Sequence, residues 1–383
     1  MNYNKRLILS LIIIGLISII FGISSNVNDN AVLSMNSEEE AIYKGRVEPL
    51  RDGKRYVNPF PSIQQKKTSP RESFRAHRKE KGVIRPTEPL PIDFVDISKA
   101  LPNEKEGLHV TWLGHSAILI QIDGVNIMID PVFKYNVSPI PLITRKRFQK
   151  ELPINLDEIP YLDAVFISHN HFDHLDKGAI KQLSPKTTAI LVPQGVGKLV
   201  KKWVKDDSKI REYTWWQEDE ITGISGGKLQ YVCTPAHHYT SRSLIDRNKT
   251  LWASWVFIGS QHRVFYSGDT SEGFHFKQIG YHYGPFDLTM IDSGQYNELW
   301  ADVHLMPESA IQAHVDLKGW YYIPVHWGVY ALALHNWWEP GERSVNEARK
   351  KGVNILTPRM GQTLLIDSNT KTDEWWQKHA IIK

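Results

Sequence analysis

Four side chains that can ligate a metal ion occur within six residues of this 383-residue chain. They are His169, His171, Asp173 and His174. Buried imidazoles and carboxylates cost free energy unless a partner satisfies them, and clustering multiplies that cost. A bound cation removes it, so the cluster predicts a metal site. In an extended loop His169 and His171 point the same way, whereas Asp173 and His174 can face a second centre, so the spacing favours two metals.

Three further candidate ligands, His238, Asp269 and His326, each come shortly after the end of a predicted strand. Loops at the carboxyl ends of strands in α/β sheets are where ligands and metals usually lie. We therefore expect these three side chains to converge with the histidine cluster on one rim of the fold.

The donor atoms narrow the choice of metal without fixing it. Imidazole nitrogen and carboxylate oxygen suit zinc best, while iron, manganese and cobalt stay open. The chain has a single cysteine, Cys233, which excludes an internal disulfide and a multi-cysteine metal site. A catalytic site also keeps one coordination position open for water, and two metals about 4 Å apart can activate that water. The sequence therefore predicts a hydrolase with two zinc ions per chain, with other divalent transition metals as alternatives, in which Asp173 or Asp269 handles the proton of the attacking water.

The elements that must position these residues alternate between strands and helices, which predicts an α/β fold in four layers (αββα), although periodicity alone does not separate it from other α/β folds. Asp123-Gly124 predicts a tight hairpin turn, and Pro307 with Glu308 is typical of a helix start. We expect strands at 108–113, 117–122, 125–129, 163–168, 229–233, 252–258, 263–266, 287–291, 320–325 and 363–366, and helices at 177–183, 307–317 and 344–351.

The chain before the predicted domain divides into two parts. Residues 1–23 contain an apolar run after Lys5 and Arg6, which indicates a signal peptide or an N-terminal membrane anchor. The mediocre small-residue cleavage site at Gly22–Ser25 favours an uncleaved anchor. Because no lysine or arginine occurs between the run and about Ala41, the basic flank predicts that the rest of the chain is exported to the non-cytoplasmic side of the membrane, in the cell envelope. Residues 24–107 form a basic arm, residues 108–368 the catalytic domain and residues 369–383 a C-terminal tail.

Positive charge is concentrated in the basic arm. Residues 44–86 hold 13 Lys/Arg and 4 Asp/Glu, or +9, whereas the whole chain carries +4. Such a segment can lie on anionic lipid headgroups or wrap on the domain, and the sequence leaves both open. Because the remainder is acidic overall, at +4 minus +9 or −5, we expect no nucleic-acid partner. The paired tryptophans Trp215-Trp216 and Trp337-Trp338 are more typical of core packing than of an acyl-chain entrance.

Several motifs of the chain together resemble the metallo-β-lactamase superfamily, and within it the group of phospholipases D that hydrolyse N-acylphosphatidylethanolamine. They occur in the order found in that family and span residues 108–366, with a weaker match at Tyr56–Pro61. The motifs are Thr111–Ser116, Asp130–Phe133, Ile167–Asp176, Cys233–His238, Leu251–Trp255, Gly268–Thr270, Gly284–Leu288 and Val325–Gly328.

The resemblance implies a set of metal ligands for each of two zinc ions. One ion would be held by His169, His171 and His238. The other would be held by Asp173, His174 and His326, and Asp269 would bridge both.

The resemblance also implies a substrate site. His304 matches a histidine of the family that lines this site, and it is expected to contact the scissile phosphate. Phe172 replaces the tyrosine usual in the family, which keeps an aromatic wall but removes a hydroxyl. The loop 293–298 keeps Tyr296 but lacks the proline and arginine that usually follow in the family.

These observations lead to one main interpretation and two alternatives. The main one is a zinc-dependent phosphodiesterase of the phospholipase D type, with a phospholipid and a membrane surface as partners and a homodimer left open. A lactonase or another ester or phosphodiester hydrolase of the same fold is an alternative within the enzyme class. A metal-binding envelope protein without turnover is the alternative from another class.

Overall fold

The computed structural model describes residues 37–63, 72, 75, 82–103, 105–138, 145–243 and 245–380. The segment predicted as a signal or anchor, residues 1–23, lies outside this part. Within the described ranges no helix is both long and apolar enough to span a bilayer. Residues Ala41–Lys383 form one compact unit.

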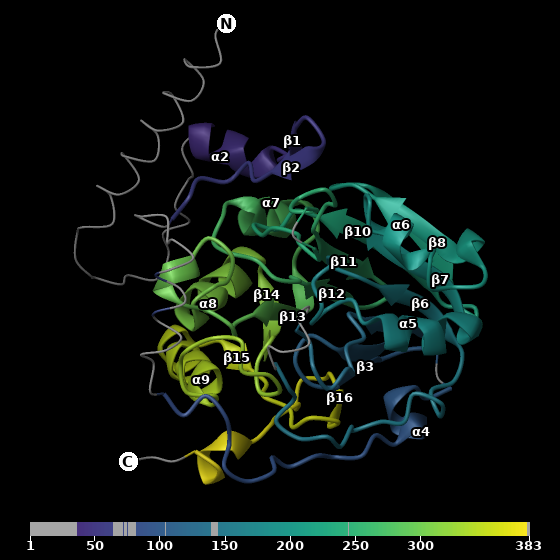
Figure 1. Ribbon diagram of the computed structural model, residues 1–383, viewed down its shortest axis with the longest axis vertical. Coiled ribbons are helices and arrows are strands. Elements are labelled where there is room, and N and C mark those ends of the chain that lie inside the picture. Colours follow the sequence, from purple (N-terminus) through teal and green to yellow (C-terminus); the bar gives the residue numbers. More distant parts are fainter. Residues whose placement is uncertain are drawn as a thin grey trace, which may run out of the picture. The chain divides into compact units, whose positions relative to one another are not determined.

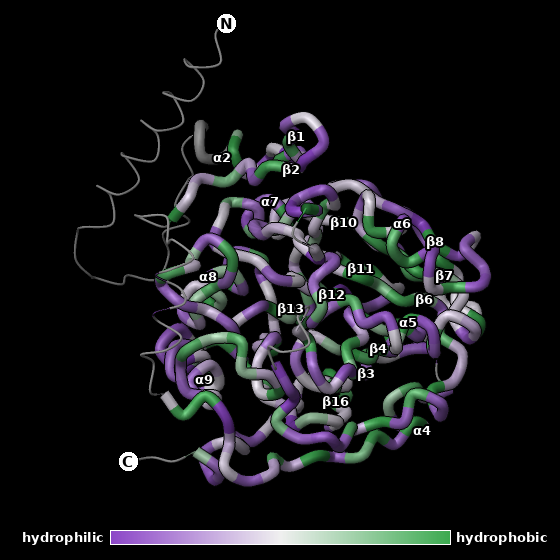
Figure 2. The backbone as a smooth tube through the Cα atoms, in the orientation of Figure 1, coloured by the Kyte–Doolittle hydropathy of each residue, from purple (hydrophilic) through white to green (hydrophobic). Residues whose placement is uncertain are grey.

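Two sheets of seven strands form the centre of this unit, within the ranges given above. Figure 2 shows that hydrophobic residues are concentrated along these central strands. The first sheet has the order β16 (Thr363–Leu365), β3 (Leu108–Trp112), β4 (Ile118–Ile122), β5 (Val125–Ile129), β6 (Leu162–Phe166), β7 (Thr187–Pro193) and β8 (Ile210–Tyr213). The second has the order β15 (Asn354–Ile355), β14 (Gly319–Val325), β13 (Phe286–Asp292), β12 (Arg263–Tyr266), β11 (Ser254–Ile258), β10 (Lys228–Thr234) and β9 (Glu218–Thr222).

Aromatic side chains join the two sheets face to face. Phe166 of β6 lies 5.1 Å from Trp255 and 4.8 Å from Phe257 of β11, both edge-to-face. The Trp255 indole also donates a hydrogen bond to the carbonyl of Ile167 at 3.0 Å. Because all of these side chains are fully buried, they form a continuous core between the sheets.

Helices cover the outer faces of both sheets (Figure 1). The helix α8 (Pro307–Asp316) packs beside β13 and β14, and α9 (Glu339–Lys351) packs beside β14 and β15. On the other sheet, α6 (Gly197–Val200) packs beside β8 and α4 (Ile97–Ala100) beside β3. The described chain also includes α2 (Ser37–Lys44), α5 (Lys177–Leu183), α7 (His275–His282) and the hairpin of β1 (Leu50–Asp52) and β2 (Arg55–Val57). The predicted four-layer α/β architecture is confirmed.

The boundaries of several elements differ from those expected. The last long helix begins at Glu339 rather than residue 344, because Pro340 is tolerated in a first helical turn. Strand β11 begins at Ser254 rather than residue 252. The sequence analysis predicts no element at the positions of β7, β8, β9 or α7. The short apolar run of β7 is equally compatible with a buried helix.

The basic arm and the C-terminal segment contribute buried side chains to the domain. Tyr56 and Phe60 of the arm are buried, and the Asn58 amide donates a hydrogen bond to the carbonyl of His238 at 2.6 Å. Trp375 and Trp376, in the predicted tail, are buried against Trp327. These residues of both segments therefore pack against the domain.

Three of the four paired tryptophans also lie in the core rather than at an entrance, and Trp338 is half-buried against that core. Trp215, Trp216 and Trp337 are each no more than 6 % exposed. The Trp215 indole donates a hydrogen bond to the carbonyl of Trp252 at 2.7 Å. These contacts agree with the preferred interpretation that the tryptophans serve packing.

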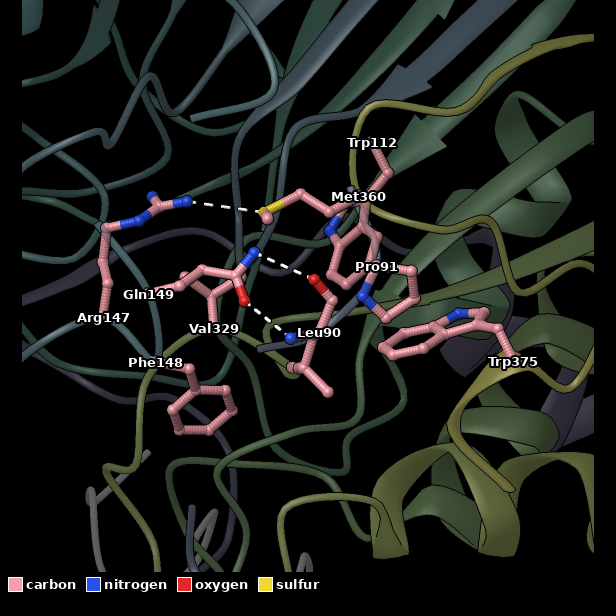
Figure 3. Close-up of a pocket in the computed structure, with 10 residues that line it drawn as sticks. Leu90, Pro91, Trp112, Arg147, Phe148, Gln149, Val329, Met360 and Trp375 are labelled. Carbon is pink, nitrogen blue, oxygen red and sulfur yellow. Dashed lines mark hydrogen bonds between the residues drawn. The ribbon is translucent and has the colours of Figure 1, made fainter. Parts of the chain in front are cut away.

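A buried arginine lines a small cavity beside Trp112 and Trp375 (Figure 3). Arg147 is 1 % exposed. Its guanidinium donates to the sulfur of Met360 at 3.4 Å and lies 5.8 Å from the centre of the Tyr330 ring. No carboxylate pairs with it anywhere in the described ranges. The arginine therefore contributes packing at the cost of burying a charge.

We predict that Arg147→Met keeps or raises the melting temperature, because methionine fills the space of the aliphatic stem and removes the buried charge. Arg147→Ala should lower the unfolding free energy by about 2 to 5 kcal/mol, because it leaves a cavity. Calorimetric melting of both variants checks this, with the exposed Arg211→Ala as the control. A methionine variant less stable than the alanine variant would contradict it.

A second buried group makes stability depend on pH. His314 of α8 is 2 % exposed, and its Nδ1 lies 2.7 Å from the hydroxyl of Thr289. Burial lowers the pKa of His314 to about 4. In the unfolded chain a histidine has a pKa of about 6.5. Between these values the unfolded state binds the extra proton, so the unfolding free energy falls as the pH is lowered from about 6.5 towards 4.

We predict that the wild type loses about 2 kcal/mol more unfolding free energy than His314→Gln does between pH ~7 and pH ~5, because the glutamine does not titrate. Urea unfolding of both proteins at the two pH values measures this. Comparing the two losses cancels the titration of all other groups. Equal losses would show that His314 does not carry the dependence.

Candidate metal centre

The candidate ligands lie at the carboxyl ends of strands from both sheets. The run from His169 to His174 follows β6, and His238 follows β10. Asp269 follows β12, and His326 follows β14. The strands β10, β12 and β14 run in the same direction, since β11 is antiparallel to both of its neighbours and β12, β13 and β14 are parallel. Their carboxyl ends therefore meet at one edge.

Four of these residues form the first group of ligand atoms. His169, His171, His238 and Asp269 each offer one atom, and these atoms all lie within 4.8 Å of one another. His171 Nδ1 is 3.3 Å from His238 Nε2. All except the half-buried His171 are buried. A spacing of this size leaves room for one ion between the atoms.

The second group contains one residue that the sequence analysis did not select. His115, Asp173, His174 and His326 also place ligand atoms within 4.8 Å of one another. His115 Nε2 lies 3.1 Å from Asp173 Oδ2. The same carboxylate oxygen is 3.2 Å from His326 Nε2. His115 therefore either orients Asp173 or offers a further nitrogen.

Asp269 lies between the two groups. Its Oδ1 is 2.9 Å from His174 Nε2 and 3.3 Å from His326 Nε2. Its Oδ2 is 3.6 Å from His169 Nε2 and 3.5 Å from His238 Nε2. Each oxygen of one carboxylate thus faces a different group.

Acceptor groups outside the clusters fix the orientation of the imidazoles. His174 donates Nδ1–H to Asp130 at 2.8 Å, and His326 donates Nδ1–H to Asp292 at 3.1 Å. His238 donates Nδ1–H to the carbonyl of Val303 at 2.9 Å. Such outer hydrogen bonds select the tautomer that leaves Nε2 with a lone pair towards the centre.

The protonation of the site favours cation binding. Burial lowers the pKa of His169 and His238 well below the usual value and that of His171 to about 4, so these imidazoles are neutral. Burial opposes ionisation of Asp269, but His174 and His326 hold its pKa well below the usual range. For His326, burial is outweighed by Asp269 and Asp292, which raise its pKa to about 10. The carboxylates therefore attract positive charge, and a divalent ion would displace protons here.

A buried atom without a hydrogen bond provides a further test of fit. His169 Nε2 is buried and makes no hydrogen bond within the described residues. An unsatisfied buried polar atom is costly. This nitrogen lies among the ligand atoms of the first group, 3.6 Å from Asp269 Oδ2. A divalent metal ion bound there would satisfy it, so the residues present fit such an ion.

The backbone at the site adopts conformations that are uncommon outside glycine. His115, Asp130 and His326 have φ values of 56°, 41° and 68°. Gly294 packs so closely that a Cβ there would lie 1.7 Å from the carbonyl oxygen of His326. Strain of this kind persists only where the surrounding structure enforces it, and it clusters at functional sites.

The three predicted substrate contacts have different outcomes. His304 lies beside the centre, with its ring 5.1 Å from that of His326, and it donates Nδ1–H to Asp292 at 2.7 Å. Phe172 is half-buried, and in the sequence it stands between the candidate ligands His171 and Asp173.

Tyr296 makes its observed contacts with other residues of the fold, and its place at the substrate site stays a prediction. It is 3 % exposed, stacks on His335 at 4.2 Å and donates its hydroxyl to Glu339 at 2.8 Å. These contacts fix the orientation of the Tyr296 side chain inside the fold.

The comparisons with known proteins agree with this geometry. Residues 125–327, more than half of the chain, match the β-lactamase superfamily domain. The chain belongs to the metallo-β-lactamase superfamily. A possible metal-dependent hydrolase from Veillonella parvula has the same fold, with a TM-score of 0.54 and 16% identity over 68% of this chain and 99% of that one.

Proteins similar to this chain occur in both bacteria and an animal. The chain is 38% identical to an uncharacterized protein of Mycobacterium tuberculosis, over 76% of this chain and 77% of the relative. It is 31% identical to the N-acyl-phosphatidylethanolamine-hydrolyzing phospholipase D 1 of Caenorhabditis elegans, over 82% of this chain and 93% of the relative. It is also 45% identical to the outer membrane protein RomA of Klebsiella pneumoniae, over 24% of this chain and 70% of that protein.

The family, the fold and the site together define the class of activity. This superfamily member is a metal-dependent hydrolase, and its histidine and aspartate clusters are candidate sites for a divalent metal.

The sequence analysis assigned no role at the metal centre to three residues that contact the candidate ligands: His115, Asp130 and Asp292. The signal for Asp130 and Asp292 was present, since Asp130 directly follows β5 and Asp292 is the last residue of β13. Both therefore stand at the same edge as the candidate ligands. The role of His115 depends on its contact with Asp173, which lies 58 residues further along the chain. The spacing of residues in the sequence does not reveal such a contact.

We predict that Asp269→Ala removes bound metal from both groups, because each oxygen of this carboxylate faces one of them. Hydrolytic activity should fall about a hundredfold or more, since even outer-shell changes cost up to that much. Elemental analysis after gel filtration measures the metal content. The exposed Asp207→Ala is the matched control and should keep both properties. Full metal content in Asp269→Ala would refute its position as the shared ligand.

Proposed function

We propose that this chain is a zinc-dependent phosphodiesterase of the phospholipase D type. It would hydrolyse N-acylphosphatidylethanolamine, or a related phospholipid, to phosphatidic acid and an N-acylethanolamine. The observation that carries this proposal is the single carboxylate of Asp269 between two groups of ligands. The choice of lipid is supported by the similarity to the Caenorhabditis elegans phospholipase over 93% of its length.

The proposal assigns seven residues to two zinc ions. His169, His171 and His238 would hold one ion, Asp173, His174 and His326 the other, and Asp269 would bridge them. When bound, such ions lower the pKa of water and draw charge from a phosphoryl oxygen. In the reaction the oxygen of water bonds to phosphorus, the bond from phosphorus to the ethanolamine oxygen breaks, and that oxygen leaves as a hydroxyl.

The chain's own residues then orient the substrate and move protons. Asp173 is the candidate carboxylate nearest to solvent, with 15 % of its side chain exposed against 2 % for Asp269. It is therefore the better placed of the two to accept a proton from water. His304 is fixed by Asp292 through Nδ1, which leaves Nε2 free to contact the phosphate. Phe172 gives this rim an apolar wall.

A location at the cell envelope is part of the proposal. The apolar run within residues 1–23 would anchor or export the chain, and the catalytic domain would meet its lipid at the non-cytoplasmic membrane surface. The similarity to a protein named for the outer membrane, over a quarter of this chain, supports that location.

The test is hydrolysis of N-acylphosphatidylethanolamine in mixed micelles by the zinc-loaded full chain. In ¹⁸O-labelled water we expect the label in phosphatidic acid and none in the N-acylethanolamine, because the account places the attack at phosphorus. Mass spectrometry of both products measures this, with Asp269→Ala as the inactive control. Turnover of a soluble lactone or phosphodiester without hydrolysis of the lipid would contradict the choice of substrate.

A further inference from the structure

A cavity of about 370 Å³ opens beside Phe172, at the rim of the candidate metal centre. Its lining is unusually rich in positive charge. We call it the basic pocket, and its four cationic residues are Lys134, Lys177, Lys181 and Arg242. The one acidic residue in its lining is Asp176. The pocket therefore carries a formal surplus of three positive charges.

The three lysines are free to bind a ligand. Lys134, Lys177 and Lys181 are exposed, and none of their ammonium groups makes a hydrogen bond or an ion pair with any residue that the structure describes. Exposed lysines elsewhere, such as Lys201 and Lys228, pair with neighbouring carboxylates. A group of unpaired like charges around one hollow raises the local potential and attracts anions.

Arg242 gives the pocket a rigid side. Its Nη1 donates to the carbonyls of Asn170 and Leu175, both at 2.8 Å. Its guanidinium lies 4.0 Å from the centre of the Phe172 ring. Nη2 and Nε make no hydrogen bond within the described residues. The arginine is thus held in one orientation with two donor groups still available.

Asp176 does not neutralise this arrangement. It is 6 % exposed, and it caps α5 by accepting a hydrogen bond from the backbone N–H of Gly178 at 2.8 Å. Its other oxygen accepts a hydrogen bond from the N–H of Phe133 at 3.2 Å. Both carboxylate oxygens are therefore engaged with backbone groups of the fold.

The basic pocket adjoins the proposed reaction site. Phe172 lines the pocket and stands in the chain between His171 and Asp173, one residue from each group of ligand atoms. Lys134 lies 5.6 Å from the centre of the same ring, and its backbone carbonyl accepts a hydrogen bond from Tyr330. A ligand in the pocket would therefore contact the wall of the metal centre.

We propose that the basic pocket is a second anion-binding site, which takes a phosphate group in addition to the phosphodiester cleaved at the metal centre. It extends the proposed function by giving the enzyme a contact with a neighbouring anionic headgroup or with free phosphate. Phosphate fits because its oxygens accept hydrogen bonds from several ammonium groups and from a guanidinium at once. Binding here does not depend on turnover, so this proposal and the proposed function can fail separately.

The test compares Lys177→Gln/Lys181→Gln with Lys371→Gln/Lys378→Gln in the zinc-loaded full chain. The second pair is the matched control, since these lysines are also exposed and make no ion pair in the described structure. Vesicles of phosphatidylcholine, with and without phosphatidic acid, are the probes, and cosedimentation measures binding. A parallel calorimetric titration uses inorganic phosphate. Melting temperature and zinc content establish that every variant is folded.

We expect the pocket variant to bind the anionic vesicles about tenfold more weakly than the control, because each basic residue near an anionic surface contributes substantially to binding. Lys177→Arg/Lys181→Arg should restore the affinity. The same difference with inorganic phosphate would identify free phosphate as a ligand, whereas a difference with vesicles alone would identify the lipid headgroup. Equal binding of both probes by the pocket variant and the control would overturn the proposal.

Discussion

The negative charge of Asp269, buried among four imidazoles, is the constraint on which the rest of the site depends. A carboxylate in such a place is stable only if positive charge lies within a few ångströms. Without an ion, protons on His174 and His326 supply that charge. Two divalent ions would supply it better, because one oxygen of Asp269 faces each group of ligands. The site is therefore arranged for cations even before its chemistry is considered.

The fold meets this demand by bringing strand ends from both sheets to one edge. The outer acceptors Asp130 and Asp292 then turn the imidazoles inwards, and His326 keeps a left-handed backbone that the close approach of Gly294 helps to enforce. The face-to-face packing of Phe166 on Trp255 and Phe257 holds the two sheets together beneath this edge. A metal centre built from two sheets depends on that core for its precision.

Much of this arrangement could be predicted from the sequence, for identifiable reasons. The ligand residues stand out because histidines and aspartates are clustered or follow predicted strands. Pro307 and Glu308 mark the start of α8. The role of His115 could not be predicted, because it depends on a contact with Asp173 that the chain makes only after folding. Tyr296 matched a family position, yet its side chain turns to Glu339, and only packing decides that direction. Strand β7 has an unbroken apolar run after Thr188, so it carries no alternation to distinguish a strand from a buried helix.

The central claim is that two metal ions share Asp269. Anomalous X-ray diffraction from crystals of the wild-type protein, recorded on both sides of the zinc absorption edge, tests this claim directly. The account predicts two peaks, one enclosed by His169, His171 and His238 and one by Asp173, His174 and His326, with the carboxylate of Asp269 between them. A single peak, or a second peak away from Asp269, would contradict it.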